Sequence, residues 1–391
     1  MREPDQAVKT MVEVVENLVI GGGPAGSMAA QCLAAAGRNV VLCEKERAAH
    51  DKVCGEFLSS EAIAYLQPAG IDLHALGARA IDQVRFTSGR RTVNARLPFT
   101  AMSLSRRVLD ETLLKRAQEA GCDIRRGACA ERLEKTAGAW RVHLRDARTV
   151  EAANVFLATG KHDLSRWERS GGAQGDLVGF KMHWRLSPVQ NEALCGAMEL
   201  FLFRDGYGGL SLIEDEIANL CFVVRRGRLR KLGGWHGLID AILQELPLLR
   251  ERLDGAAAQW TKPLAISPIP YGFIANPTDG LWRVGDQAAV IPSFTGDGMS
   301  IALHSARLAA EMYLAGRSAE EYVRCLAEQL RASMRIATAL SRAMVTGTGR
   351  LLAPALLSVL PDAMSRIADW TRIPSDALLA SQRFQRTVST A

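Results

Sequence analysis

The chain has 391 residues, of which 48% are hydrophobic, and its formal net charge is +6. This length suits two or three domains, or one domain interleaved with another, and the apolar content excludes an intrinsically disordered chain. Zinc-finger spacings and RNP-like segments are absent from the sequence, so the modest basic excess gives no support for nucleic-acid binding.

The eight cysteines include no CxxC pair, which indicates free thiols in a reducing compartment. The first ten residues are polar, so we expect no signal peptide. No window reaches the ~18 uninterrupted apolar residues that a membrane-spanning helix needs. We therefore expect a cytoplasmic protein without a metal site.

The stretch from Val14 to Glu44 has the order strand, glycine turn, helix, strand, acid. This order is typical of a dinucleotide-binding unit. Gly21 permits a tight turn, Gly23 lets the backbone approach a pyrophosphate, and Gly26 lets the helix lie close to the strand. The acid Glu44 can accept hydrogen bonds from a ribose, which favours FAD or NAD over NADP. The alternative is a glycine-rich turn in an ordinary βαβ unit.

Further along the chain, mixed helix and strand patterns continue. Residues 60–70 and 106–120 have helical spacing, and residues 80–100 and 128–152 alternate as strands. Residues 155–158 form a fully apolar strand that runs into a Thr-Gly turn. These elements extend the α/β pattern of the N-terminal unit.

From residue 176 the pattern becomes rich in strands and loses the βαβ rhythm. We therefore assign this block to a second, antiparallel domain. A helix over residues 235–253 follows it. The expected strands are 178–186, 198–203, 209–213 and 217–224.

The C-terminal third begins with a strand that ends in Gly285-Asp286. A loop over residues 292–298 and a helix over 299–315 follow, and residues 319–391 are helical by pattern. The apolar piece 351–361 is interpreted as a helical cap over the core. A weak contact with a membrane interface is the alternative.

The segment VGDQAAVIPSFTGDGMSIALHSARLAA resembles the flavoprotein group that contains p-hydroxybenzoate hydroxylase-like monooxygenases and geranylgeranyl reductases. The resemblance implies that FAD is the resident cofactor and that Asp286 binds its ribityl chain. It also implies that the loop with Gly296 and Gly298 lies against the flavin ring. Independently of the resemblance, those two glycines would let the backbone approach a flat ring.

Three other segments resemble the same group. By this resemblance, Arg107, which begins an Arg-x-x-Asp segment, would contact the cofactor. Ala158-Thr159-Gly160 would pass the FAD a second time, and Lys52-Val53-Cys54-Gly55 would pass by the flavin. The implied cofactor-binding residues are Gly21, Gly23, Pro24, Ala25, Gly26, Glu44, Lys45, Cys54, Gly55, Arg107, Ala158, Thr159, Gly160, Gly285, Asp286, Gly296, Gly298 and Met299. The candidate substrate-pocket residues are Tyr207, Gly209, Pro292 and Phe294.

Catalytic candidates are few, as expected where a cofactor carries the chemistry. Cys54 is the candidate beside the flavin, and its alternative is a buried structural cysteine. His162 and His183 are candidate proton donors, with surface or strand histidines as the alternative. The Ala-Asp-Gly core that NAD(P)H-using hydroxylases carry is absent. NADH or NADPH, bound transiently, or an electron-donor protein would then reduce the cofactor.

We therefore expect an α/β protein with a Rossmann-type FAD domain, an antiparallel sheet domain for substrate and C-terminal helices. The FAD domain comprises residues 12–75, 100–170 and 268–320; the substrate domain comprises 76–99 and 171–267; the C-terminal helical segment is 321–391.

The expected function is that of an FAD-dependent oxidoreductase acting on a hydrophobic or aromatic small molecule. A monooxygenase is favoured, and a C=C reductase like the geranylgeranyl reductases is the alternative. A non-catalytic electron-transfer flavoprotein is the alternative of another class. Halogenation has no motif support, because no Trp-x-Trp segment occurs.

Overall fold

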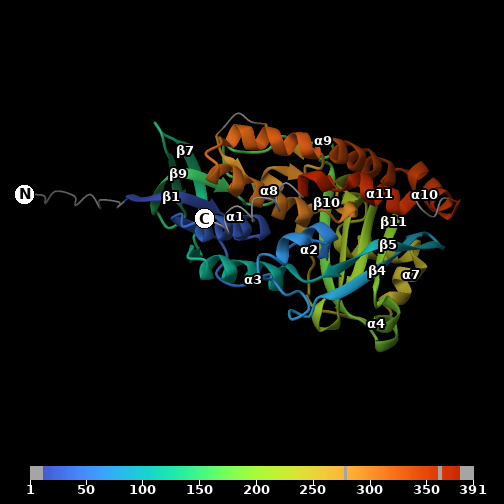
Figure 1. Cartoon of the computed structure of the whole chain (residues 1–391). Coiled ribbons are helices and arrows are strands. Elements are labelled where there is room, and N and C mark those ends of the chain that lie inside the picture. Colours follow the sequence, from blue (N-terminus) through green and yellow to red (C-terminus); the bar gives the residue numbers. More distant parts are fainter. Residues whose placement is uncertain (1–11, 277–279, 360–362, 379–391) are drawn as a thin grey trace, which may run out of the picture.

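Two large β-sheets and the helices around them form the protein (Figure 1). The structure is a computed structural model that describes residues 12–276, 280–359 and 363–378. The mixed architecture confirms the α/β class, with parallel and antiparallel sheets and helices at the C-terminal end.

Sheet A contains the N-terminal unit and has the strand order β6-β2-β1-β9-β8-β7, with β17 beside the end of β9. Strands β1, β2, β6, β9 and β17 are mutually parallel, so their carboxyl ends meet at one edge. Such an edge is where open α/β sheets bind ligands. The strands are β1 Val12–Ile20, β2 Val40–Glu44, β6 Asp123–Arg126, β7 Ala130–Lys135, β8 Trp140–Leu144, β9 Thr149–Leu157 and β17 Trp282–Arg283.

Sheet B is mostly antiparallel and has the order β14-β10-β13-β12-β11-β4-β5-β3, with β15 paired to β10. The exception is β4, which pairs in parallel with β11 and so joins the segment before α3 to the later strands. The strands are β3 Phe57–Leu58, β4 Arg79–Ser88, β5 Arg91–Ser103, β10 Leu177–Arg185, β11 Ala197–Phe203, β12 Gly206–Leu212, β13 Ile217–Arg225, β14 Ala257–Ala258 and β15 Leu264–Ile266. A small separate pair is formed by β16 Phe273–Ile274 and β18 Ala289–Val290.

The helices pack around both sheets. Helix α1 packs against α3 and α8, and the long α9 runs along one side of the molecule toward sheet B (Figure 1). The helices are α1 Pro24–Ala35, α2 Ser60–Leu66, α3 Arg106–Glu119, α4 Pro188–Leu194, α5 Arg226–Lys231, α6 Trp235–Glu245, α7 Pro247–Arg252, α8 Gly298–Leu314, α9 Ala319–Met344, α10 Gly347–Val359 and α11 Ala363–Thr371, and three 3-10 turns span Glu214–Glu216, Gly285–Gln287 and Ser293–Thr295. Within the described ranges, no helix combines the length and apolarity that crossing a bilayer requires.

Local sequence explains where several helices begin and end. The Ser105 hydroxyl accepts a hydrogen bond from the Val108 amide and caps α3. The expected helix over 235–253 is wrong as one piece, because Pro247 divides it into α6 and α7. A residue before proline avoids the helical conformation, and Leu246 accordingly has a φ of −121°.

The C-terminal helices cover sheet B. Helix α10 packs against β4 and β5, and Leu357 is buried there. This position agrees with the helical cap expected from the sequence, although Leu351 and Leu356 are exposed. Leu360 and Pro361 of that segment and residues 379–391 lie outside the described residues.

Candidate functional site

A cavity of about 1090 Å³ begins at the carboxyl edge of sheet A and continues between sheet B and the C-terminal helices. Its first part is lined by the glycine turn after β1, by the loop after β2 and by the turn after β9. Its second part is lined by strands of sheet B and by residues of α9, α10 and α11. The cavity therefore joins the expected cofactor site to an apolar compartment.

The glycine turn has the close contacts that its sequence predicts. Gly21 has a φ of +108°, and a Cβ there would lie 2.4 Å from the carbonyl oxygen of Ala158. A Cβ on Gly26 would lie 1.9 Å from the carbonyl oxygen of Gly21, so α1 can approach β1 only because this residue is glycine. The Gly22 amide donates a 2.7 Å hydrogen bond to Glu44, which places the acid beside the turn.

Two cations converge on the start of helix α1. A Cβ on Gly23 would lie 3.4 Å from Arg106 Nη2 and 4.0 Å from Lys52 Nζ. Arg106 donates to both oxygens of Asp110 at 2.7 and 2.9 Å, and Lys52 donates to Asp110 at 2.9 Å. Burial raises the pKa of Asp110, but Arg106 and Lys52 outweigh it, so its net pKa is lowered. The helix N-terminus and these cations together suit a diphosphate.

The arginine of the cavity is Arg106 and not the Arg107 expected from the sequence. Arg106 lines the cavity, whereas Arg107 is exposed and lies outside the cavity wall. The helical period explains the difference, since Arg106 pairs with Asp110 four residues later and the next residue points about 100° away.

Asp286 lies at the sheet edge after β17 and lines the cavity. Its carboxylate accepts a 2.9 Å hydrogen bond from Lys161, and Arg169 donates to its carbonyl oxygen at 2.7 Å. Burial raises the pKa of Asp286, but the Lys161 ammonium outweighs burial and the net pKa is lowered. The carboxylate is therefore available as an acceptor next to a cation that the sequence analysis missed.

The loop before α8 forms another part of the wall. Gly296 has a φ of +75°, and a Cβ there would lie 2.6 Å from the ring of Phe57. Phe294 meets Tyr207 of sheet B edge to face, with ring centroids 5.9 Å apart. The Tyr207 hydroxyl lies 3.1 Å from that of Ser341 in α9. This loop thus joins the cofactor end of the cavity to sheet B.

Cys54 lies in the cavity wall and is partly buried. Its sulfur accepts a 3.3 Å hydrogen bond from the Glu56 amide, and its carbonyl accepts one at 3.1 Å from Asn219 of β13. Nearby, burial lowers the pKa of the Arg106 guanidinium, but Asp110 outweighs burial and raises it overall. The segment after β2 is therefore tied to sheet B beside the cavity.

The structure places most of the residues expected from sequence in the cavity wall. Gly26 lies beneath the turn, Arg107 is exposed, and Pro292 is buried outside the wall. His162 lines the cavity, whereas His183 lies in a buried ionic cluster next to it. The expected residues that line the wall are Gly21, Gly23, Pro24, Ala25, Glu44, Lys45, Cys54, Gly55, Ala158, Thr159, Gly160, Tyr207, Gly209, Gly285, Asp286, Phe294, Gly296, Gly298 and Met299.

The second part of the cavity was only partly anticipated. Its apolar lining comes from elements that are far apart in the sequence, and no local pattern marks them as neighbours. These residues are Val84, Phe86, Leu97, Phe99, Met198, Leu200, Leu340, Met344, Leu352, Leu356, Leu357 and Ile367. Together with the cation pair at Gly23 and the acids Glu44 and Asp286, the wall has donors and acceptors at one end and apolar surface at the other. A cavity with a polar end and an apolar end fits FAD at the polar end and an apolar substrate at the other.

Comparisons with known proteins agree with this assignment of the cofactor. The sequence family described as FAD binding domain matches residues 14–170. A menaquinone reductase of Mycolicibacterium smegmatis is 25% identical over 97% of this chain and 99% of its own length. A digeranylgeranylglycerophospholipid reductase of Methanosphaera stadtmanae is 25% identical over 74% of this chain and 75% of its own length.

Solved structures share the fold. A geranylgeranyl bacteriochlorophyll reductase-like protein from Thermoplasma acidophilum has a TM-score of 0.69 and 20% identity, covering 95% of this chain and 96% of that one. A flavin-dependent brominase has a TM-score of 0.74 and 16% identity, covering 96% and 98%. Residues 14–170 match an FAD-binding family, and the chain resembles the superfamily that contains p-hydroxybenzoate hydroxylase-like monooxygenases and geranylgeranyl reductases. It is an FAD-dependent oxidoreductase.

Proposed function

We propose that the protein reduces a carbon–carbon double bond in an apolar, chain-like small molecule. The observation that carries this proposal is the continuation of the cavity beyond the loop at Phe294. It passes Phe86 and Leu200 of sheet B and reaches Leu352 and Leu357 of α10. An extended apolar channel suits a long hydrocarbon chain better than a compact aromatic ring, because its whole length offers apolar contact.

The relatives support the same choice. The two curated relatives described above are named as reductases, one of menaquinone and one of a digeranylgeranyl lipid. Both names denote molecules that carry long isoprenoid chains. We extend that substrate class to this chain on the strength of its own apolar channel.

Different residues of the cavity wall would bind different parts of the cofactor. Arg106 and Lys52 would hold the diphosphate of FAD, Glu44 would accept hydrogen bonds from the ribose, and Asp286 would accept them from the ribityl chain. Once a nicotinamide or a donor protein has reduced it, bound FAD would supply the hydride for the reduction. The reaction also consumes a proton, and the Cys54 thiol in the wall is our candidate donor.

We also propose that the chain divides as the sequence indicates, into an FAD domain around sheet A and a substrate domain around sheet B. The proposed substrate domain includes all of β5, which continues to Ser103 rather than ending at residue 99. The C-terminal helices would then close the substrate channel from the side opposite sheet B.

A product analysis tests the proposed reaction. The purified, FAD-loaded protein is incubated with menaquinone or a geranylgeranyl lipid, with dithionite as anaerobic reductant and with NADH or NADPH in air. Because dithionite by itself reduces the quinone ring of menaquinone, only an anaerobic, enzyme-dependent gain of two hydrogen atoms in the hydrocarbon chain of the product supports the reductase. A product that gains one oxygen atom, only in air, establishes the monooxygenase favoured from the sequence.

Two controls complete the test. Replacing Leu200 by Trp should block the channel and abolish turnover of the long lipid. FAD absorbance should stay unchanged, because Leu200 lies on β11 of sheet B whereas the glycine turn follows β1 of sheet A. Bound FAD without turnover of any substrate would favour the electron-transfer alternative. Oxidation of NADH or NADPH would identify a nicotinamide donor, and its failure beside successful dithionite turnover would indicate a donor protein.

A further inference from the structure

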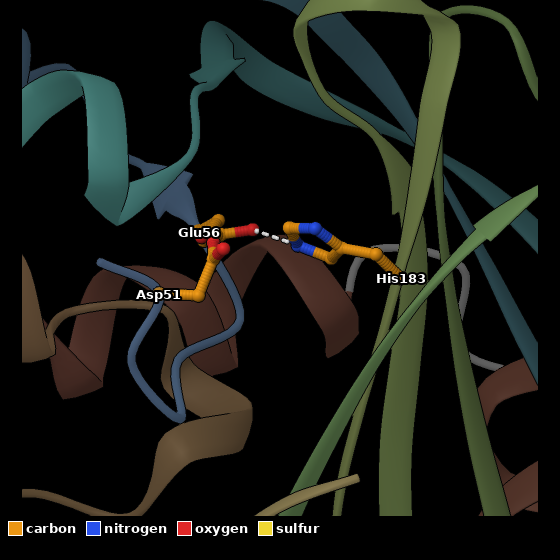
Figure 2. A group of neighbouring side chains, drawn as sticks. All are labelled: Asp51, Glu56 and His183. Carbon is orange, nitrogen blue, oxygen red and sulfur yellow. Dashed lines mark hydrogen bonds and ion pairs between the residues drawn. The ribbon is translucent and has the colours of Figure 1, made fainter. Parts of the chain in front are cut away.

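A buried ionic cluster lies between the loop after β2 and strand β10 of sheet B (Figure 2). It consists of Asp51, Glu56, Lys181 and His183. Glu56 and Lys181 have no exposed side-chain surface and form an ion pair. His183 Nε2 lies 3.1 Å from the other Glu56 oxygen, and Lys181 Nζ lies 3.5 Å from Asp51. Lys181 and His183 are two residues apart in a strand, so both side chains leave the same face.

The cluster has the ligand types of a metal site but already contains its cation. One ligand atom from each of Asp51, Glu56 and His183 lies within 4.8 Å of the others. The Lys181 ammonium contacts both carboxylates of that group. A divalent ion held there would be repelled at close range by this ammonium, where burial weakens screening. The arrangement therefore favours a structural role for the charges over metal binding.

Glu56 connects this cluster to the wall of the FAD cavity. Its carboxylate accepts a 2.8 Å hydrogen bond from the Arg106 amide at the start of α3. Its own amide donates to the sulfur of Cys54 at 3.3 Å. Its backbone has a φ of +58°, a left-handed conformation that is uncommon for glutamate and is held here by these bonds. One residue thus fixes both the turn that carries Cys54 and the helix end that carries Arg106.

Two side chains of β10 determine the orientation of the Glu56 carboxylate. Lys181 and the Arg106 amide share one carboxylate oxygen, and His183 occupies the other. A carboxylate bonded at both oxygens has one orientation, whereas a partly bonded one can rotate. Burial raises the pKa of Glu56, but Lys181 and His183 outweigh burial and lower it overall, so the carboxylate is charged near neutral pH.

We propose that Glu56 is a positioning residue of the FAD site, oriented by Lys181 and His183 of sheet B. It sets the Cys54 thiol and the Arg106 guanidinium in the cavity wall and makes their placement depend on sheet B. Its relevance to catalysis rests on the proposed function, in which Cys54 supplies the proton. Its effect on geometry can be measured without turnover.

The test uses Glu56→Gln in the full-length, FAD-loaded protein. Glutamine keeps the size of the side chain but loses the charge that Lys181 requires. Loss of a charged anchor should free the turn, so the rate of Cys54 alkylation by iodoacetamide, followed by peptide mass spectrometry, should rise about 5- to 30-fold. FAD should also bind more weakly, because a neutral glutamine oxygen accepts the hydrogen bond from the Arg106 amide less strongly than the carboxylate does.

The matched control is Glu199→Gln. Glu199 is also buried and paired with arginines, Arg85 and Arg252, but it contacts neither the Cys54 turn nor α3. It should lower the melting temperature while leaving FAD affinity and Cys54 alkylation at wild-type values. If Glu56→Gln fails to fold, His183→Phe removes a single donor and should shift alkylation in the same direction by less.

Several results would overturn the proposal. A folded Glu56→Gln protein with wild-type FAD affinity and wild-type Cys54 alkylation refutes the positioning role, even if turnover is lost. If Glu199→Gln changed FAD affinity and Cys54 alkylation as much as Glu56→Gln does, the effect of Glu56 would be one on overall stability and not on the FAD site. If elemental analysis found stoichiometric zinc in the wild-type protein, the conclusion that the Lys181 ammonium takes the place of a metal ion in this cluster would be refuted. By contrast, if Glu56→Gln raises the rate of Cys54 alkylation as predicted but the wild-type protein has no reductase activity, the proposed reaction is rejected and the positioning role is retained.

Discussion

Replacing Arg106 by methionine should weaken FAD binding, whereas replacing its neighbour Arg107 by methionine should not. Arg106 lies beside the open face of Gly23, where a diphosphate would meet the N-terminus of α1. Arg107 is exposed and lies outside the cavity wall. The two variants have the same change of charge, helix and composition, so the comparison isolates position.

The magnitude follows from the chemistry of the contact. A hydrogen bond to a charged group contributes about 1.5–3 kcal/mol, which corresponds to a rise in the dissociation constant of about 10- to 150-fold. The fold should survive, because Asp110 keeps its 2.9 Å bond with Lys52 when the guanidinium is gone. Methionine retains much of the apolar stem, which limits the loss of packing.

Titration of the apoprotein with FAD, followed by flavin fluorescence, gives the dissociation constant directly. The rise of the melting temperature on adding FAD provides a second measure, since it depends on the ratio of ligand concentration to dissociation constant. If the Arg106→Met protein binds FAD within twofold of wild type, the cation pair does not hold the diphosphate. If Arg107→Met has the larger effect, our placement of the cavity wall is wrong.

Three other predictions follow from the site. Gly26→Ala should lower the melting temperature and weaken FAD binding, because its Cβ would lie 1.9 Å from a backbone oxygen and helix α1 must move away; unchanged FAD affinity would contradict this. Asp286→Ala should lower the flavin content of the purified protein, and equal absorbance at equal protein concentration would contradict the assigned role. The lowered pKa of Glu56 means that its ion pair stabilises the fold above pH 4.5, the ordinary value, and that this stabilisation is lost as pH falls through the lowered folded value. The difference in melting temperature between wild type and Glu56→Gln should therefore shrink below pH 4.5, and a constant difference would contradict the pKa assignment.

The sequence was informative wherever function depends on short, fixed spacings. The glycine turn and the acid Glu44 lie within one βαβ unit, and the geometry of such a unit is dictated by local backbone requirements. The segment Gly285-Asp286 returns to the same sheet edge because β17 pairs with the end of β9. The expected α/β class follows from the same alternation of apolar strands and helices.

Prediction and structure differ where a sequence pattern identifies a helix or strand but not its rotation about its own axis or the residues that it contacts. The helix containing Arg107 was correctly placed, yet its rotation brings Arg106 to the cavity. The i, i+4 pairing with Asp110 was a signal that could have identified it. The pairing of Glu56 with Lys181 had no such signal, because the two residues meet only when sheet B docks against the loop after β2.

The parallel pairing of β4 with β11 has a consequence for how the chain folds during synthesis. During synthesis, β4 with Gln83 leaves the ribosome before its partner strand β11 with Ala197, so the sheet becomes continuous only after β11 has been made. Until then, the hairpin of β4 and β5 presents an unpaired edge that can recruit other chains. Long-range strand pairing of this kind slows folding. A fragment ending at residue 170 would contain the whole glycine turn but would expose the unpaired edge of β4. We therefore expect it to aggregate when expressed alone.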